Sequence, residues 1–220
     1  MKDRIEILEK IKRKKSVIWD FDGVIKDSVD IKGKVFNKLF IDQEQNIKDK
    51  ILNHHKENGG VSRYNKLRIY LKWSSFENSN ENINLYASKF SKLVIKEVIN
   101  SSYIEGAKDY LKNNFKRQNF YLVSATPQEE ISKITKELYI FNFFIKVFGY
   151  PFTKENCFKS ILENSIHTKK DFIVIGDSLT EYKAAKKYNL DFILRTDKSK
   201  DNLPEWYIEK DQIIKNFLVG

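Results

Sequence analysis

Three aspartates follow two strongly apolar stretches that lie far apart in the chain. Asp20 and Asp22 come at the end of the run at residues 17–25, and Asp177 directly follows the run at residues 172–176. A continuous apolar run without polar alternation is typical of a buried strand in a parallel sheet. Ligands of open α/β sheets bind at the carboxyl ends of the strands, so we expect these carboxylates to meet at one edge of a sheet.

Carboxylates at this position favour phosphoryl chemistry. Asp20 could attack a phosphorus atom and form an aspartyl-phosphate, and Asp22 could protonate the leaving oxygen and later activate water. Clustered carboxylates repel one another unless a cation lies among them, and hard oxygen ligands beside a phosphate favour Mg²⁺, with Asp177 as a further ligand. The alternative is a turn with solvated acids. The apolar strand before the pair and Gly23 after it favour the chemical interpretation.

A set of short motifs resembles those of the haloacid dehalogenase-like (HAD) phosphohydrolase superfamily, in the same order along the chain. The resemblance covers about two-thirds of the sequence and is closest to the branch of phosphoglycolate phosphatases and β-phosphoglucomutases. The motifs are Asp20-Phe21-Asp22-Gly23-Val24, Val123-Ser124-Ala125-Thr126, Lys154 and Gly176-Asp177-Ser178.

The resemblance implies roles for the motif residues outside the carboxylates. Gly23, Ser124 and Ala125 would bind phosphate oxygens, and the backbone carbonyl of Asp22 would join Asp20 and Asp177 on Mg²⁺. Lys154, which fits a Pro-x-x-Lys spacing, would neutralise the nucleophile and the phosphate, with Lys159 as a rival. A lysine at the start of a helix is otherwise disfavoured, since cations prefer the other end.

Glu181 departs from the family pattern, because many relatives carry aspartate at this position. It is predicted as a metal-site residue, acting either through a water or only as a partner in helix capping. Two capping boxes are expected, at Ser178–Glu181 and at residues 126–129 with Pro127 at the first helical position.

The pattern of apolar residues predicts an α/β fold: a Rossmann-like parallel sheet flanked by helices, with an inserted all-helical cap domain. Residues 1–28 and 101–220 would form the core, and residues 29–100 the cap, which would close over the acids and exclude water. Helical spacing in the insert and at residues 3–13 (Ile5, Leu8 and Ile11) supports this division. Strands are expected near residues 16–21, 120–124, 144–148, 172–176 and 191–194, and helices at residues 103–115 and 203–218.

Inside the insert, residues 54–66 stand out. The double glycine Gly59-Gly60 marks a turn, and Ser62 is suited to cap a helix that carries Arg63 and Lys66 on one face. Such a helix start with two cations would suit an anionic substrate group; the alternative is a surface turn followed by a charged helix face. The segment resembles caps found in surface-polysaccharide and sugar-acid pathways. We expect His54 and His55 to be surface residues rather than metal ligands.

The composition narrows the classes of partner. The chain of 220 residues has a formal net charge of +10, but its lysines are spread along the sequence rather than massed in one block. We therefore expect an anionic small molecule and no nucleic acid as partner. The single cysteine, Cys157, excludes an intrachain disulfide and fits a reducing compartment. With no apolar run long enough for a membrane span and no signal peptide, we expect no membrane partner and a cytoplasmic location.

These observations predict a Mg²⁺-dependent phosphatase that hydrolyses a small phosphorylated metabolite through an aspartyl-phosphate. By family likeness the substrate would be a sugar or sugar-acid phosphate. A phosphomutase of the same fold is an alternative, and a non-catalytic basic binding module is a weaker one. A dehalogenase is disfavoured, because dehalogenases of this fold lack the second acid and Asp22 is present.

Overall fold

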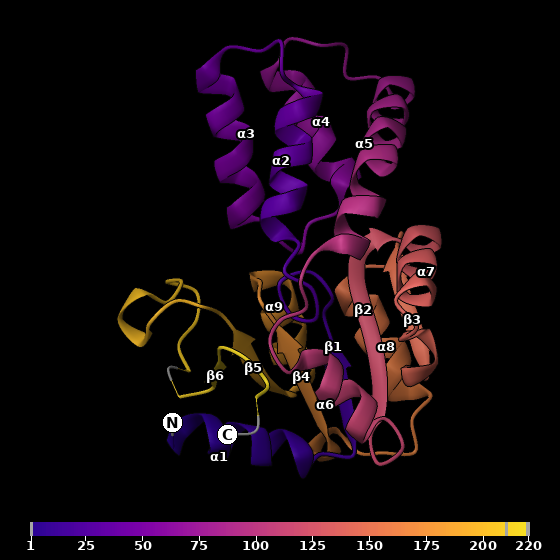
Figure 1. Cartoon of the computed structure of the whole chain (residues 1–220), viewed down its shortest axis with the longest axis vertical. Coiled ribbons are helices and arrows are strands. Elements are labelled where there is room, and N and C mark those ends of the chain that lie inside the picture. Colours follow the sequence, from indigo (N-terminus) through magenta and orange to yellow (C-terminus); the bar gives the residue numbers. More distant parts are fainter. Residues whose placement is uncertain (1, 210, 219–220) are drawn as a thin grey trace.

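The fold is built on a parallel sheet whose central strand carries the first acid motif. The computed structural model describes residues 2–209 and 211–218, and within them the strands take the order β3-β2-β1-β4-β5-β6 (Figure 1). All pairings are parallel, and β1 is fully buried between β2 and β4. The strands are β1 (Ser16–Trp19), β2 (Asn119–Pro127), β3 (Lys146–Tyr150), β4 (Phe172–Gly176), β5 (Asp191–Arg195) and β6 (Ile213–Ile214).

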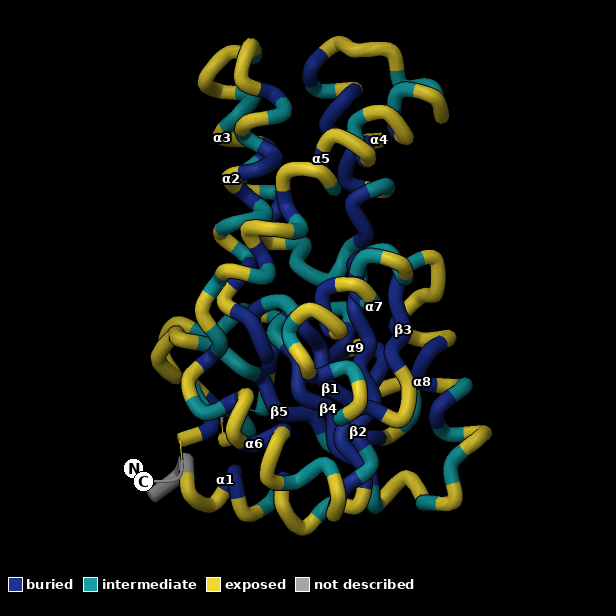
Figure 2. Tube along the Cα trace, turned by 45° about the vertical axis from the view of Figure 1, so that its right-hand side comes forward, coloured by how far each residue is buried: buried dark blue, intermediate teal, exposed yellow. Residues whose placement is uncertain are grey.

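Helices cover both faces of this sheet because successive strand residues point to opposite sides. Val17 and Trp19 of β1 join one apolar cluster with α1, α6 and α7, whereas Ile18 joins the other with α8 and α9. The central strands between the two clusters are coloured as buried in Figure 2. These helices are α1 (Lys2–Lys12), α6 (Ala107–Asn114), α7 (Gln128–Glu137), α8 (Lys154–Glu163) and α9 (Leu179–Tyr188). The predicted α/β sheet flanked by helices is confirmed.

Residues 29–100, called the insert below, are described throughout and contain helices without a strand. They stand beyond the carboxyl ends of the sheet strands (Figure 1). An aromatic cluster holds them together, with the ring of Phe36 4.4 Å from that of Phe90 and 5.1 Å from that of Tyr70. The helices are α2 (Val29–Leu39), α3 (Gln45–Glu57), α4 (Arg63–Trp73) and α5 (Asn80–Asn100). Within the described residues, no helix has the length and apolar character needed to cross a membrane.

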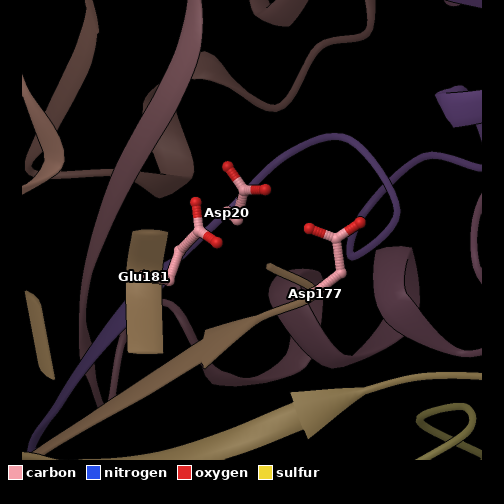
Figure 3. A group of neighbouring side chains, drawn as sticks. All are labelled: Asp20, Asp177 and Glu181. Carbon is pink, nitrogen blue, oxygen red and sulfur yellow. The ribbon is translucent and has the colours of Figure 1, made fainter. Parts of the chain in front are cut away.

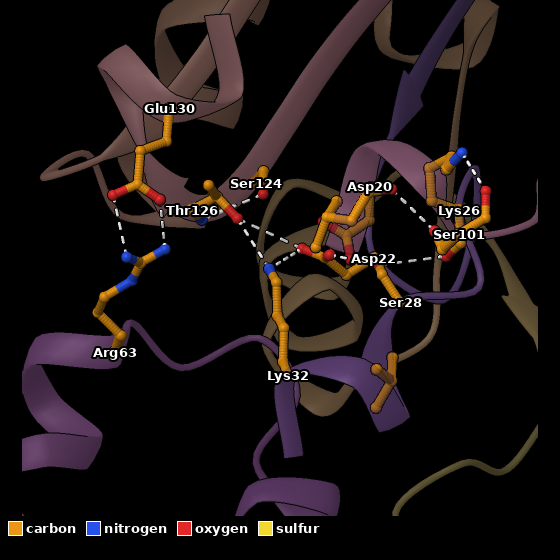
Figure 4. Close-up of polar contacts among 12 residues, drawn as sticks. Asp20, Asp22, Lys26, Ser28, Lys32, Arg63, Ser101, Ser124, Thr126 and Glu130 are labelled. Carbon is orange, nitrogen blue, oxygen red and sulfur yellow. Dashed lines mark hydrogen bonds and ion pairs between the residues drawn. The ribbon is translucent and has the colours of Figure 1, made fainter. Parts of the chain in front are cut away.

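The two segments that connect the insert to the sheet lie side by side. The amide of Asp27 donates to the carbonyl of Ser102, and the amide of Ile104 donates to the carbonyl of Ile25. Lys26, only 1% exposed, donates from its ammonium to the carbonyls of Ile99 and Ser101 (Figure 4). The insert therefore leaves and rejoins the core through one paired connection.

Several predicted boundaries differ from the structure. The N-terminal helix forms, but Ile5 is 47% exposed while Leu8 and Ile11 are buried. The capping box predicted at residues 126–129 is wrong: α7 begins at Gln128 with Pro127 as its N-cap, without a side-chain cap. The hydroxyl of Thr126 instead lies beside Asp22, because β2 continues through Thr126 to the edge of the sheet.

The helix predicted at residues 203–218 is wrong for its described part. The chain there forms the short edge strand β6, in which the amide of Thr196 donates to the carbonyl of Ile214. The adjacent β-branched residues Ile213 and Ile214 favour pairing with β5. One of the predicted residues, 210, lies outside the described part of the chain.

Candidate active site

Asp20 lies directly after β1, where its backbone amide donates to the carbonyl of Ile175 in β4. Its carboxylate is buried and forms an ion pair with Lys154, with Oδ1 2.5 Å from Nζ. Burial raises the pKa of Asp20 to about 7. The charge of Lys154 acts to lower this pKa, whereas the charges of Glu181 and Asp22 act in the same direction as burial. A cation near this carboxylate would favour its ionised, nucleophilic form.

Lys154 begins α8 and points back under the ends of the strands. Its ammonium contacts Asp20, the carbonyl of Val123 at 2.5 Å and Glu181 Oε1 at 2.6 Å. Burial would lower the pKa of Lys154, but the two carboxylates outweigh burial and raise it. These contacts explain a lysine at a helix start, where the dipole alone disfavours it. The rival Lys159 is exposed and faces Glu163 on the surface.

Glu181, in the first turn of α9, is 1% exposed and joins the same cluster. The helix starts after Ser178 as expected, but the predicted capping box is wrong because the Ser178 side chain does not cap the backbone. The Ser178 hydroxyl instead donates to the Glu181 carboxylate, whose other oxygen meets Lys154. Competition from this buried lysine removes the carboxylate from its capping role.

Asp177 follows β4 and completes a group of acids (Figure 3). Asp20, Asp177 and Glu181 each offer one carboxylate oxygen, and these oxygens lie within 4.8 Å of one another. Burial, followed by the charges of Asp20 and Glu181, raises the pKa of Asp177 well above its ordinary value. Hard oxygen donors that repel one another at this spacing fit a divalent metal ion.

The side chain of Asp22 lies outside this acid group. Its Oδ1 accepts a 2.6 Å hydrogen bond from Ser28, and its Oδ2 forms an ion pair with Lys32 of α2 (Figure 4). Lys32 also donates to Thr126 Oγ1 at 2.9 Å. Burial acts to raise the pKa of Asp22, but Lys32 outweighs it and lowers the pKa. The backbone carbonyl of Asp22, not its side chain, remains the predicted metal ligand.

Gly23 is required by the close approach of the two acid loops. Its φ is +78°, and a Cβ there would lie 2.2 Å from Asp177 Oδ2. Ser124 and Ala125 line a cavity of about 450 Å³ that also reaches Lys154. Ser124 and Ala125 therefore share a cavity with Lys154, and Ser124 Oγ accepts a hydrogen bond from the amide of Thr126 at 3.1 Å.

The double-glycine turn of the insert touches the catalytic edge of the sheet. A Cβ on Gly60 would lie 1.7 Å from Thr180 Oγ1 and 3.0 Å from Glu181 Oε1. Only glycine allows this approach. A smaller cavity of about 40 Å³ lies between the insert and the acids, and its lining includes Asp22, Asp177 and Lys32.

The model of the haloacid dehalogenase-like hydrolases matches residues 17–195, which spans the acid motifs, Lys154 and the insert. This chain belongs to that family. The family predicted from the motifs is thereby confirmed, as is the expectation of a hydrolytic enzyme.

Solved structures support the fold of this hydrolase. A predicted phosphoglycolate phosphatase from Haemophilus somnus has a TM-score of 0.72 at 17% identity, covering 93% of this chain and 95% of its own. A β-phosphoglucomutase from Clostridium difficile has a TM-score of 0.69 at 17% identity, covering 93% and 92%. YfnB from Bacillus subtilis, solved with magnesium, has a TM-score of 0.67 at 19% identity, covering 93% and 95%. A comparison with curated proteins finds no match.

In this haloacid dehalogenase-like hydrolase, Arg63 of the insert was predicted to bind a substrate anion, but it is paired with a carboxylate of the core. Its guanidinium forms a bidentate pair with Glu130 of α7, with distances of 2.9 and 2.5 Å (Figure 4). Ser91 of α5 donates to the same carboxylate, and the guanidinium lies 4.5 Å from the Phe90 ring centroid. Ser62 caps α4 as predicted, by accepting the amide of Asn65. Arg63 therefore joins the insert to the core.

Lys66 lies one turn further along α4 and lines the small cavity with Asp22 and Asp177. It is 2% exposed, and its ammonium contacts His55 Nδ1 at 2.9 Å. The expectation that both histidines are surface residues is wrong for His55, which is 4% exposed between α2 and α4.

Sequence reasoning missed Lys32, His55 and Glu130. Lys32 follows Asp22 by ten residues and lies in the first turns of α2, a spacing that carries no specific signal. His55 was singled out only for its place beside the double glycine. Glu130 becomes relevant only when α7 packs near the insert, which local sequence does not reveal.

Proposed function

We propose that this hydrolase is a Mg²⁺-dependent phosphatase that moves the phosphoryl group of a small phosphomonoester to Asp20 and then to water. The observation that carries the proposal is a buried cluster around Asp20. Its Oδ1 lies 2.5 Å from Lys154 Nζ, and one carboxylate oxygen from each of Asp20, Asp177 and Glu181 lies within 4.8 Å of the others. A nucleophile, a fixed cation and an oxygen-rich metal site then lie together at the ends of the strands.

Mg²⁺ is the metal that this donor set suits best. Asp20, Asp177 and the backbone carbonyl of Asp22 would hold it, with Glu181 contacting it directly or through a water. When bound, the ion would stabilise negative charge on the transferring phosphoryl group. The magnesium-bound structure of the similar protein YfnB supports this choice.

In the first step, an oxygen of Asp20 attacks phosphorus and the bond from phosphorus to the ester oxygen breaks. Asp22 gives a proton to that leaving oxygen. Lys154 stabilises the charge on the phosphoryl oxygens, since its ammonium lies against Asp20. Backbone and side-chain donors at Gly23, Ser124 and Ala125 would hold the remaining oxygens.

In the second step, water attacks the phosphorus of the aspartyl-phosphate and Asp22 accepts a proton from that water. The bond between phosphorus and the Asp20 oxygen breaks, which releases phosphate and restores the carboxylate. The ion pair of Lys32 with Asp22 favours the ionised carboxylate, which suits Asp22 as the base in this step and opposes its role as the acid in the first step.

The insert would act as a cap over the site. Gly60 lies close to Thr180 and Glu181, and Lys32 pairs with Asp22, so closure of the insert would exclude bulk water from the acids during transfer. The partner we propose is a small phosphorylated metabolite, such as a sugar or sugar-acid phosphate.

A phosphomutase is the second candidate, because a β-phosphoglucomutase is among the similar solved structures. It would use the same residues but return the phosphoryl group to a second hydroxyl. With sugar phosphates as substrates, release of free phosphate supports the phosphatase, whereas formation of an isomer supports the mutase.

The proposal is tested with Asp20→Asn and 4-nitrophenyl phosphate in the presence of Mg²⁺. We expect turnover to fall by roughly 10³-fold or more, since the nucleophile is lost, with an unchanged circular dichroism spectrum. Asp27→Asn, an exposed aspartate in the same connection, is the matched control and should keep its turnover. Turnover retained by Asp20→Asn rejects the mechanism, and turnover that survives chelation of divalent metals rejects the metal requirement.

A further inference from the structure

Lys66 is a buried ammonium that has no carboxylate partner within ion-pair distance in the described part of the chain. Its contacts are the Nδ1 atom of His55 at 2.9 Å and the backbone carbonyl of His55 at 3.4 Å. A buried charge is normally paired, because burial without a counter-charge costs free energy. Lys66 is therefore poised for a counter-charge that the protein itself does not supply.

His55 orients this ammonium and does not neutralise it. The His55 Nε2 atom lies 3.1 Å from the carbonyl of Val29, which can only accept, so Nε2 carries the proton. Nδ1 is then an acceptor for the Lys66 ammonium. Burial, followed by the charge of Lys66, lowers the pKa of His55 to about 3, which keeps the ring neutral.

The other lysine and arginine side chains around the small cavity are already paired. Lys32 is held by Asp22, and Arg63 is held by Glu130. Asp177 belongs to the acid group that suits a metal ion. Burial and the charge of Lys32, opposed by Asp22 and Asp177, lower the pKa of Lys66 to about 7, as expected for an ammonium whose counter-charge is missing.

We propose that Lys66 receives a carboxylate carried by the leaving group of the substrate, so that the enzyme selects phosphomonoesters with this second anionic group. This inference rests on the proposed phosphatase function. The cavity that joins Lys66 to Asp22 has about 40 Å³ of free space, and a single water needs roughly 10–15 Å³. Because this space is small, we assign it to a carboxylate, which is a smaller group than a second phosphate with its ester oxygen.

Matched substrate pairs test the inference. One pair is 2-phosphoglycolate with 2-hydroxyethyl phosphate, and another is 3-phosphoglycerate with glycerol 3-phosphate. A third pair, glucose 1,6-bisphosphate with glucose 1-phosphate, tests a second phosphate instead. We expect kcat/KM of the wild type to favour the carboxylate member of at least one pair by roughly 10- to 100-fold, as for one charge-assisted hydrogen bond.

Variants connect this preference to Lys66. In Lys66→Met the ratio of kcat/KM within the carboxylate pair should fall toward one, while Lys66→Arg should restore part of it. Lys72→Met is the matched control, because it removes the same charge from an exposed position on the same helix. It should keep the wild-type ratio.

Calorimetric binding of the same pairs to Asp20→Asn in Mg²⁺ gives the comparison without turnover. A wild-type protein without preference for the carboxylate member, or with preference only for the bisphosphate, overturns the inference. So does a preference that survives in Lys66→Met. Absence of hydrolysis with the binding preference intact would reject the phosphatase function and leave the anion site standing.

Discussion

Two buried lysines at the opposite sides of the site have contrasting surroundings. Lys154 in the core is 8% exposed and touches the carboxylates of Asp20 and Glu181. Lys66 in the insert is 2% exposed and touches only the side chain and carbonyl of His55. Paired carboxylates raise the pKa of the first, and burial lowers the pKa of the second to about 7. Lys154 finds its counter-charges within the protein, whereas Lys66 presents a charge that a ligand would meet.

Removal of the paired lysine should have the largest effect. In Lys154→Met, Asp20 and Glu181 would lie buried and repel each other without their shared ammonium. We expect turnover of 4-nitrophenyl phosphate to fall by roughly 10³-fold and the free energy of unfolding, measured in urea with chelator, to fall by about 3–5 kcal/mol.

The matched control for this variant is Lys159→Met, which removes an exposed charge from the same helix. It should change the free energy of unfolding by less than about 0.5 kcal/mol. Equal effects of the two substitutions would contradict the distinction between paired and surface lysines.

The second prediction concerns Arg63, a cation of the insert that would lose its carboxylate partner. Glu130→Gln leaves the Arg63 guanidinium, 5% exposed in its side chain, without its carboxylate. Because a buried charge that loses its partner is strongly destabilising, we expect a loss of about 3 kcal/mol in urea unfolding. Glu129→Gln, at the exposed neighbouring position, should hardly change the free energy of unfolding. If Glu130→Gln lowers it just as little, the pair of Arg63 with Glu130 does not contribute to stability.

Substitution of the unpaired lysine should have the opposite sign. Between pH 7 and about 10.5 the unfolded chain holds a proton on Lys66 that the folded chain lacks, so this group makes wild-type stability rise with pH. Its penalty is therefore greatest below pH 7. We expect Lys66→Met to be more stable than the wild type by about 1 kcal/mol at pH 6, with the difference shrinking toward pH 10.

Urea unfolding of both proteins at pH 6, 8 and 10 measures this trend. Lys72→Met, the exposed control on α4, should show a difference that does not vary with pH in this way. Destabilisation of Lys66→Met at pH 6 by as much as Lys154→Met would mean that the protein already pairs Lys66.

A similarly small effect is expected at Lys26, whose ammonium meets carbonyls instead of carboxylates. Lys26→Met leaves the carbonyls of Ile99 and Ser101 without these donors, which should lower the unfolding free energy by about 1 kcal/mol. Lys108→Met, at an exposed position over the same Tyr103 ring, is the control. If Lys26→Met has the same thermal midpoint of unfolding as the wild type, then Lys26 contributes no more to stability than an exposed lysine does.

Two acids of the cluster, Asp20 and Asp177, could be predicted from the sequence because each follows a continuous apolar strand. Asp20 and Asp177 inherit their positions from β1 and β4, which are neighbours in a parallel sheet. Lys154 needed the family resemblance, since helix electrostatics alone disfavour it. Glu181 was predicted at the site, but its contact with Lys154 depends on the packing of α8 against α9.

Contacts between the insert and the core could not be predicted in the same way. The pairs of Lys32 with Asp22 and of Arg63 with Glu130 depend on how the insert faces the sheet, which no local pattern specifies. The C-terminal segment failed for another reason: its apolar residues have helical spacing, but pairing of Ile214 with Arg195 at the edge of the sheet prevailed.

The paired connection at Asp27 and Ser102 has a consequence for how such enzymes diversify. Both ends of the intervening helical unit meet at one point, so another unit with equally close ends could replace it without changing the order of the strands. Recombination at this junction would exchange the part proposed to recognise the leaving group, together with Lys32, and keep Asp20, Lys154 and Asp177 in place. The junction is thus a natural splice point for constructing chimaeras with new selectivity.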